Sequence, residues 1–81
     1  MKIETSIANQ IAEFLEKGNS IFTGNLATIT FKFKNGKFVR EYEDRREAET
    51  STSFLTKAEF IEKIQSYKVE DFYKLQENLN L

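Results

Sequence analysis

The sequence predicts a small single α+β domain over residues 1–81, in which a three-stranded antiparallel sheet carries its helices packed on one face. Three observations lead to this class. Apolar residues recur at helical spacing near both ends of the chain, alternate at strand spacing in the middle, and flank an Asn–Gly pair that is typical of a hairpin turn. The expected order of elements is α-β-β-β-α-α.

The N-terminal segment predicts a helix over residues 5–17. Apolar side chains follow one another there at intervals of three or four, at Ile3, Ile7, Ile11, Phe14 and Leu15. Thr5 or Ser6 can cap the start of the helix. Gly18 stands where a helix often ends in a left-handed residue. We therefore expect an amphipathic helix that packs its apolar stripe on the sheet.

From Ile21 onward the chain is rich in β-branched and aromatic residues, which favour strands. Gly24–Asn25 predicts a bulge or an early bend within the first strand. Asn35–Gly36 predicts a two-residue type I′ turn between the first and second strands, because both residues tolerate a positive φ.

This turn sets the pairing of the two strands by placing Phe33 opposite Phe38. The inward face then carries Ile29, Phe31, Phe33, Phe38 and Tyr42. A three-residue loop would put Lys37 opposite Phe33 and bury a charge. Arg40 falls on the inward face, where we expect its stem to lie over Phe31 while its head reaches water. The other face is predicted to be solvated, with Thr28, Thr30, Lys32, Lys34, Lys37, Val39, Glu41 and Glu43.

Residues 47–54 predict a third strand, because they are rich in Thr and Ser and have no helical stripe. Arg45 and Arg46 are expected in the turn before it. A helix over residues 41–49, which are rich in Glu and Ala, is the alternative. It would have almost no apolar face.

Thr56 and Glu59 form a capping box and predict a helix over residues 57–66. A second apolar stripe, with Val69, Phe72, Leu75 and Leu79, predicts another helix. The two stripes are out of phase near Lys68, which favours a break there. One long helix over residues 57–80 is the other possibility.

The composition argues against an enzyme. The chain has no Cys and no His, which removes thiol nucleophiles, thiolate and imidazole metal ligands, and the commonest general acid and base. We expect no catalytic residues, no metal and no cofactor. No apolar run approaches the ~20 residues that span a bilayer, so the expected location is cytoplasmic, with no membrane partner.

Nucleic-acid binding is one functional hypothesis. Residues 30–40 contain four basic side chains and no acid: Lys32, Lys34, Lys37 and Arg40. The order α-β-β-β-α is similar to that of double-stranded-RNA-binding domains. Those domains carry a basic cluster at the start of their last helix, whereas Lys57 and Lys63 here are mixed with Glu59 and Glu62. We therefore keep this function as the alternative.

Protein binding is the leading hypothesis, because the basic hairpin is followed by the dense charged run "REYEDRREAE". Charges separated by sign suit docking in one orientation. The expected contact set is Lys32, Lys34, Lys37, Glu41, Glu43, Asp44, Arg45 and Arg46. We expect the protein to be a monomer, or a homodimer formed through the edge of the third strand.

A short chain rich in Lys, Asn and Ile and lacking catalytic residue types resembles the small accessory proteins of phages and mobile elements. Some of these, including certain CRISPR–Cas inhibitors, share the order of one helix, three strands and two helices. The resemblance implies a non-enzymatic inhibitor or modulator. Its partner would be a larger host or phage protein, such as a nucleic-acid-processing complex.

Overall fold

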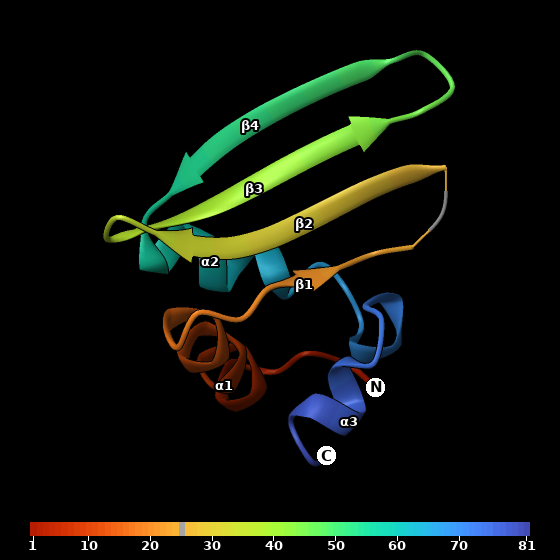
Figure 1. Ribbon diagram of the computed structural model, residues 1–81. Helices are drawn as coiled ribbons and strands as arrows, with labels where there is room; N and C mark the ends of the chain where they lie inside the picture. Colours follow the sequence, from red (N-terminus) through yellow and green to blue (C-terminus); the bar gives the residue numbers. More distant parts are fainter. Residues whose placement is uncertain (25) are drawn as a thin grey trace.

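The computed structural model describes residues 1–24 and 26–81 and shows a four-stranded antiparallel sheet with helices on one face (Figure 1). The elements are α1 (Thr5–Glu16), β1 (Ile21–Phe22), β2 (Ala27–Lys34), β3 (Lys37–Asp44), β4 (Glu49–Leu55), α2 (Lys57–Ile64), the 3₁₀ helix η1 (Val69–Asp71) and α3 (Leu75–Asn78). The strands lie side by side in the order β1-β2-β3-β4.

The predicted hairpin between β2 and β3 is confirmed. Phe33 pairs with Phe38, and the pairing continues as expected along both strands. Asn35 and Gly36 have φ angles of 53° and 80°, which is the left-handed backbone that a type I′ turn requires. The pairing therefore divides the side chains of β2 and β3 between the two faces of the sheet as the sequence predicts.

The prediction of three strands is wrong, because the expected first strand is two strands that pair with each other. Ile21 of β1 lies opposite Phe31 of β2. Thr23 closes this hairpin, since its N–H donates to the Ile29 carbonyl at 2.9 Å and its hydroxyl accepts from the Ile29 N–H at 3.0 Å. The bend expected at Gly24–Asn25 falls on Asn25, which lies outside the described residues. Because the β-branched and aromatic residues continue through both strands, the sequence pattern predicted a single strand there.

The strand predicted near residues 47–54 is confirmed as β4, at Glu49–Leu55. Arg45 and Arg46 lie in the turn before it, as expected. The alternative helix over residues 41–49 is wrong, because the first half of that segment belongs to β3. Ala48 completes the turn with a φ of 53°.

The first helix and the second are close to their predicted ranges. The N-cap of α1 is Glu4, without a side-chain hydrogen bond, so the predicted capping by Thr5 or Ser6 is wrong. The capping box of α2 is confirmed: the Thr56 hydroxyl accepts from the Glu59 N–H at 3.2 Å, and the Glu59 carboxylate accepts from the Thr56 N–H at 2.8 Å.

The expected second C-terminal helix is wrong in detail, because the chain breaks into η1 and α3. Backbone N–H groups of this segment instead form hydrogen bonds to distant parts of the chain. The Val69 N–H donates to the Met1 carbonyl at 2.9 Å, and the Tyr73 N–H donates to the Phe22 carbonyl at 2.9 Å. Lys74, with a φ of 54°, separates the two short helices.

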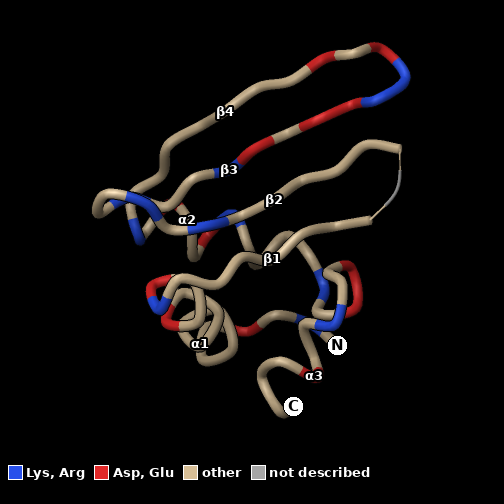
Figure 2. The backbone as a smooth tube through the Cα atoms, in the orientation of Figure 1, with Lys and Arg blue, Asp and Glu red and all other residues tan. Residues whose placement is uncertain are grey.

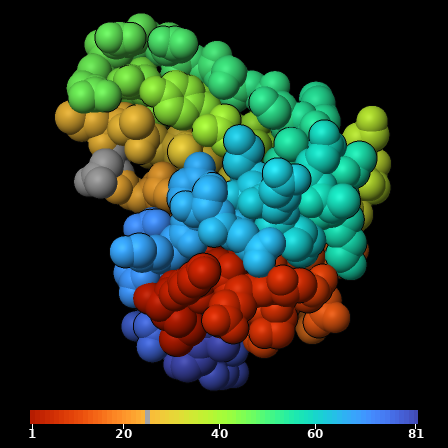
Figure 3. Space-filling view, turned by 180° about the vertical axis from the view of Figure 1, so that it is seen from behind, coloured from red at the N-terminus to blue at the C-terminus, as the bar shows by residue number. Residues whose placement is uncertain are grey.

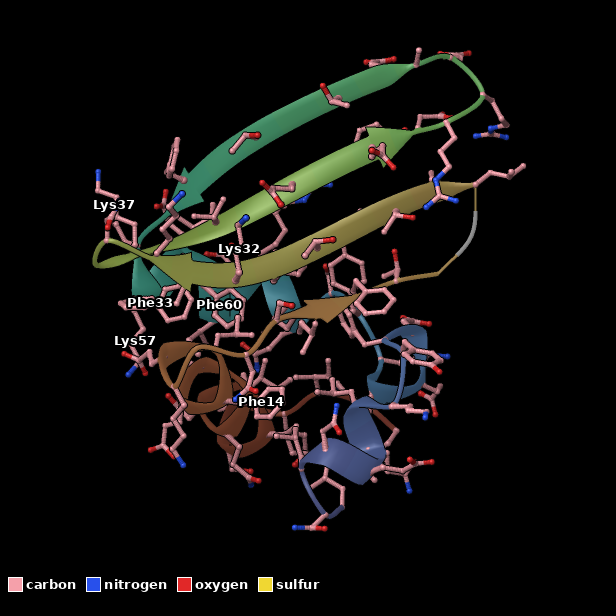
Figure 4. The ribbon with its side chains drawn as sticks, viewed as in Figure 1. Phe14, Lys32, Phe33, Lys37, Lys57 and Phe60 are labelled. Atoms are coloured by element: carbon pink, nitrogen blue, oxygen red, sulfur yellow. The ribbon has the colours of Figure 1, made fainter. Side chains whose placement is uncertain are left out.

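The core lies between the sheet and the helices, and Phe31 is at its centre. Its ring meets those of Phe60, Tyr67 and Phe72 at centroid distances of 5.5, 6.0 and 6.1 Å. Phe31 and Phe60 are fully buried. Figure 4 shows Phe33 and Phe60 on the helix side of the sheet. Figure 3 shows α1 and α2 packed against each other beneath the green end of β3 and β4, which projects beyond them.

Replacing Phe60 with alanine should lower the free energy of unfolding by about 3–5 kcal/mol, because it leaves a cavity against Phe31 and Phe38. Phe54→Ala is the matched control, since that ring is 64% exposed, and should change stability by less than about 0.5 kcal/mol. Urea unfolding measures both. Phe60→Leu should give an intermediate loss, and equal effects at positions 54 and 60 would contradict this core.

Candidate protein-binding surface

The helices cover only one face of the sheet, and we call the other its outer face. The register places these side chains on it: Thr28, Thr30, Lys32 and Lys34 from β2, Lys37, Val39, Glu41 and Glu43 from β3, and Thr50, Thr52 and Phe54 from β4. Figure 4 shows Lys32 on the side of the sheet opposite Phe33. Five of the eight predicted contact residues therefore share this face.

The basic end of the outer face lies at the β2–β3 turn. Lys34 and Lys37 are a cross-strand pair, and both are exposed. Neither forms an ion pair with a residue that the structure describes. Lys32 lies two residues before Lys34 on the same face of β2, and its ammonium is 3.3 Å from the carboxylate of Glu41 on β3. The uncompensated positive charge is therefore concentrated in two lysines at the tip (Figure 2).

The acidic end lies at the opposite end of β3, and the turn before β4 that follows it carries both basic and acidic residues (Figure 2). Glu43 is exposed there, and Arg45 donates to it at 3.3 Å through Nε. Both groups stay in contact with water, so their attraction contributes little to stability and both can bind another molecule. The lysines and the glutamates of β2 and β3 thus occupy separate ends of the outer face.

Asp44 differs from the other predicted contact residues because it is only 5% exposed. Its carboxylate accepts from the Arg46 N–H at 3.0 Å, from Arg46 Nε and Nη2 at 3.2 and 3.1 Å, and from the Tyr42 hydroxyl at 3.3 Å. The Arg46 side chain therefore holds the pKa of Asp44 below its ordinary value, against the effect of desolvation. Burial and the negative charge of Asp44 raise the pKa of Tyr42. Asp44 fixes the turn rather than presenting a free carboxylate.

Arg40 also lies apart from the lysines. It pairs with Phe31 and Ser53 on the helix side of the sheet and is half-buried. Its Nε is buried without a hydrogen-bond partner among the described residues, which shows that the inner part of the guanidinium is desolvated. The four basic residues of the nucleic-acid hypothesis therefore do not form one patch.

Sequence reasoning missed Phe54 as a surface residue. It pairs with Val39, which is only 3% exposed, and its own ring is 64% exposed. A hollow of about 450 Å³ lies beside it, near Lys37 and Lys57. Its place follows from the β3–β4 register, which no short turn signature in the sequence indicates. An exposed aromatic ring next to charged groups is a typical anchor for a protein partner.

The middle of the outer face is hollowed and polar. The hollow has a volume of about 250 Å³ and is lined by Thr28, Thr30, Glu41, Tyr42, Glu43, Thr50, Ser51 and Thr52. Across residues 1–24 and 26–81, no three carboxylates come together in a way that could hold a metal ion. In the same residues, no helix has the length and apolar character to cross a bilayer. The arrangement offers hydrogen-bond and charge contacts for recognition.

Comparison of the chain with protein families, with curated proteins and with solved structures finds no match.

The stability that Asp44 contributes should depend on pH. Because its pKa is lowered by folding, its contribution is present above about pH 4 and is lost as the pH falls through the lowered value. Asp44→Asn should be less stable than the wild type near neutral pH, and the difference should shrink in acid. Urea unfolding at about pH 7, 5 and 3 measures this. Glu47→Gln, at an exposed position of the same turn, is the control and should show no such trend.

Proposed function

We propose that this protein is a non-enzymatic module that binds a larger protein through the outer face of its sheet. The observation that carries the proposal is that this whole face is left uncovered by the helices while its charges are separated by sign. Lys34 and Lys37 mark one end and Glu43 marks the other, with Phe54 beside the lysines. The composition, which lacks Cys and His, supports binding over catalysis.

Such a face binds with little rearrangement, because the backbone beneath it is held in a hydrogen-bonded sheet. The exposed ring of Phe54 can fill a pocket on the partner and lose contact with water there, which is how aromatic residues contribute most at interfaces. The two charged ends set the orientation of docking and speed the encounter. The proposed contact set is Lys32, Lys34, Lys37, Glu41, Glu43, Arg45, Arg46 and Phe54, with Asp44 left out because it is buried.

The resemblance to accessory proteins of phages and mobile elements suggests the class of partner. We propose a larger host or phage protein, such as a nucleic-acid-processing complex, whose activity the bound module inhibits or modulates. The sheet has four strands, whereas the accessory proteins of that resemblance have three. The proposal of binding therefore rests on the outer face of the sheet and not on the resemblance. Any inhibition would come from occupying the partner's surface.

Nucleic-acid binding is the second candidate, favoured by the adjacent exposed ammonium groups of Lys34 and Lys37. It is weaker because Lys32 is paired with Glu41 and Arg40 lies on the other face. Single-strand platforms also need several aromatic rings on the open face, whereas Phe31 and Phe38 are buried and Phe54 is the exposed ring beside the lysines.

Reversing the charge at the basic end should weaken partner binding without unfolding the protein. In an affinity capture from host lysate treated with nuclease, Lys34→Glu with Lys37→Glu should recover much less of the bound protein than the wild type does. The melting temperature should be nearly unchanged, because both side chains are exposed. Quantitative mass spectrometry of the captured fraction measures the effect.

The matched control makes the same charge change away from the outer face, at Lys17 and Lys63, both exposed on the helical side. It should bind as the wild type does. Equal loss with both double variants would mean that net charge alone drives capture, against docking through this face. Recovery that disappears on nuclease treatment would favour the nucleic-acid candidate instead.

Direct binding to nucleic acid should be weak or absent. We expect no retarded band for duplex or single-stranded DNA or RNA in a mobility-shift assay at low salt, because two exposed lysines neutralise few phosphates. A band that weakens steeply with added salt and is lost in the Lys34→Glu, Lys37→Glu variant would contradict this expectation.

A further inference from the structure

The strand β4 forms an open edge of the sheet. Among the described residues, its seven residues pair only with β3. Glu49–Phe54 are all exposed, on both faces. Figure 1 shows no element beyond β4, and Figure 3 shows its end clear of the helices. An edge of this kind presents unpaired backbone N–H and C=O groups to any strand that fits it.

The register shows which backbone groups are free. A two-residue turn is closed by a hydrogen-bonded pair, here Lys34 and Lys37, and bonded and non-bonded pairs then alternate along β2 and β3. The β3 residues whose backbone groups face β4 rather than β2 are Phe38, Arg40, Tyr42 and Asp44. They pair with Leu55, Ser53, Ser51 and Glu49 of β4. The N–H and C=O groups of Thr50, Thr52 and Phe54 therefore face the open edge.

Apart from Glu49 at its start, β4 carries nothing that guards this edge. Natural sheets protect their edges with lysine, proline, a bulge or a very short strand. The opposite edge has such protection, because β1 is only two residues long and β2 carries Lys32 and Lys34 beyond it. β4 is a regular strand with no Lys and no Pro. A single open edge among the described residues allows a closed pair rather than a filament.

We propose that two copies of this chain pair through β4, antiparallel about a two-fold axis at Thr52, and so join their sheets. This register pairs all seven residues of β4: Thr52 with Thr52, Ser51 with Ser53, Thr50 with Phe54, and Glu49 with Leu55 of the second copy. It also brings the outward-facing groups of Thr50, Thr52 and Phe54 onto hydrogen-bonded positions in both copies.

The charges beside the strand favour this orientation. Glu47 and Glu49 lie at one end of β4, and Lys57 follows the other end. Antiparallel pairing brings the acidic end of each copy beside the Lys57 end of the other, whereas parallel pairing would align like charges. The exposed ring of Phe54 would lie beside Thr50 of the second copy, on the outer face. The strand is thus complementary to itself, which favours a second copy over an unrelated extended segment.

Thr52→Pro tests the proposal, because proline lacks the N–H that faces the open edge at this position. The substitution removes no hydrogen bond between β4 and β3. In sedimentation equilibrium over a range of concentrations, the wild type should dimerise, and the variant should dimerise about 10- to 100-fold more weakly or not at all. The melting temperature at low concentration should stay close to that of the wild type. Ser53→Pro, whose N–H faces β3, is the contrasting variant and should destabilise the fold itself.

The register can be tested by charge. Only an axis at Thr52 places position 52 opposite itself, so Thr52→Lys and Thr52→Glu should each weaken the dimer by repulsion. An equal mixture of the two variants should restore dimers that contain one of each, as seen by native mass spectrometry. Circular dichroism confirms that both variants are folded before mixing.

A wild type that stays monomeric up to its solubility limit would overturn the proposal and leave the edge to a segment of another protein. A Thr52→Pro variant that dimerises as well as the wild type, or variants that form no mixed dimers, would overturn this interface. The inference does not rest on the proposed function. Thr52→Pro leaves Lys34, Lys37 and Glu43 in place, and their charge reversals leave the β4 backbone unchanged, so the two failures are distinguishable.

Discussion

The two-residue turn at Asn35–Gly36 is the constraint on which the two faces of the sheet depend. It pairs Phe33 with Phe38, and strict alternation then carries Phe31 inward and Lys32 outward. A slip of one residue would exchange the two sets, bringing ammonium groups against α1 and α2 and phenylalanine rings into water. The buried aromatic core and the charged outer face are thus two consequences of one local choice, which only residues tolerant of positive φ allow.

One-sided packing follows from how the apolar residues are distributed. The rings of Phe60, Tyr67 and Phe72 gather around Phe31, all on the helix side. On the outer face Val39 is nearly covered by its neighbours, while the ring of Phe54 stays 64% exposed. No second layer exists in the described residues to enclose a reaction site over that face. The outer face is therefore open to solvent over the described residues, and the hollow at its middle is lined by hydroxyls and carboxylates.

The sequence correctly predicted the features that are determined by residues close together in the chain. The β2–β3 register, the Thr56–Glu59 capping box and the left-handed Gly18, with a φ of 101°, follow from a few neighbouring residues. The predictions failed where distant backbone decides. The predicted second C-terminal helix is broken into η1 and α3, and the N–H groups of Val69 and Tyr73 bond instead to the carbonyls of Met1 and Phe22. Periodicity carries no trace of such bonds. The alternation of side chains predicted that the lysines of β2 and β3 lie on the outer face. The burial of Asp44 could not be predicted in this way, because it depends on how Arg46 folds back over it. The exposed position of Phe54 depends on the register of β3 and β4, and the four-residue turn that joins them has no distinctive sequence signature.

The outer face and the open edge meet in the same three residues, and this links the two proposals physically. Thr50, Thr52 and Phe54 direct their side chains to the outer face while their backbone groups face the edge. Pairing through β4 would therefore extend the outer face across the axis and place two copies of its charge pattern on one continuous surface. A partner with two matching sites would then meet the second copy at a high effective concentration, so that a weak contact at each site gives strong binding overall. A small sheet with one covered face and one open edge can in this way gain affinity by assembly rather than by a larger core.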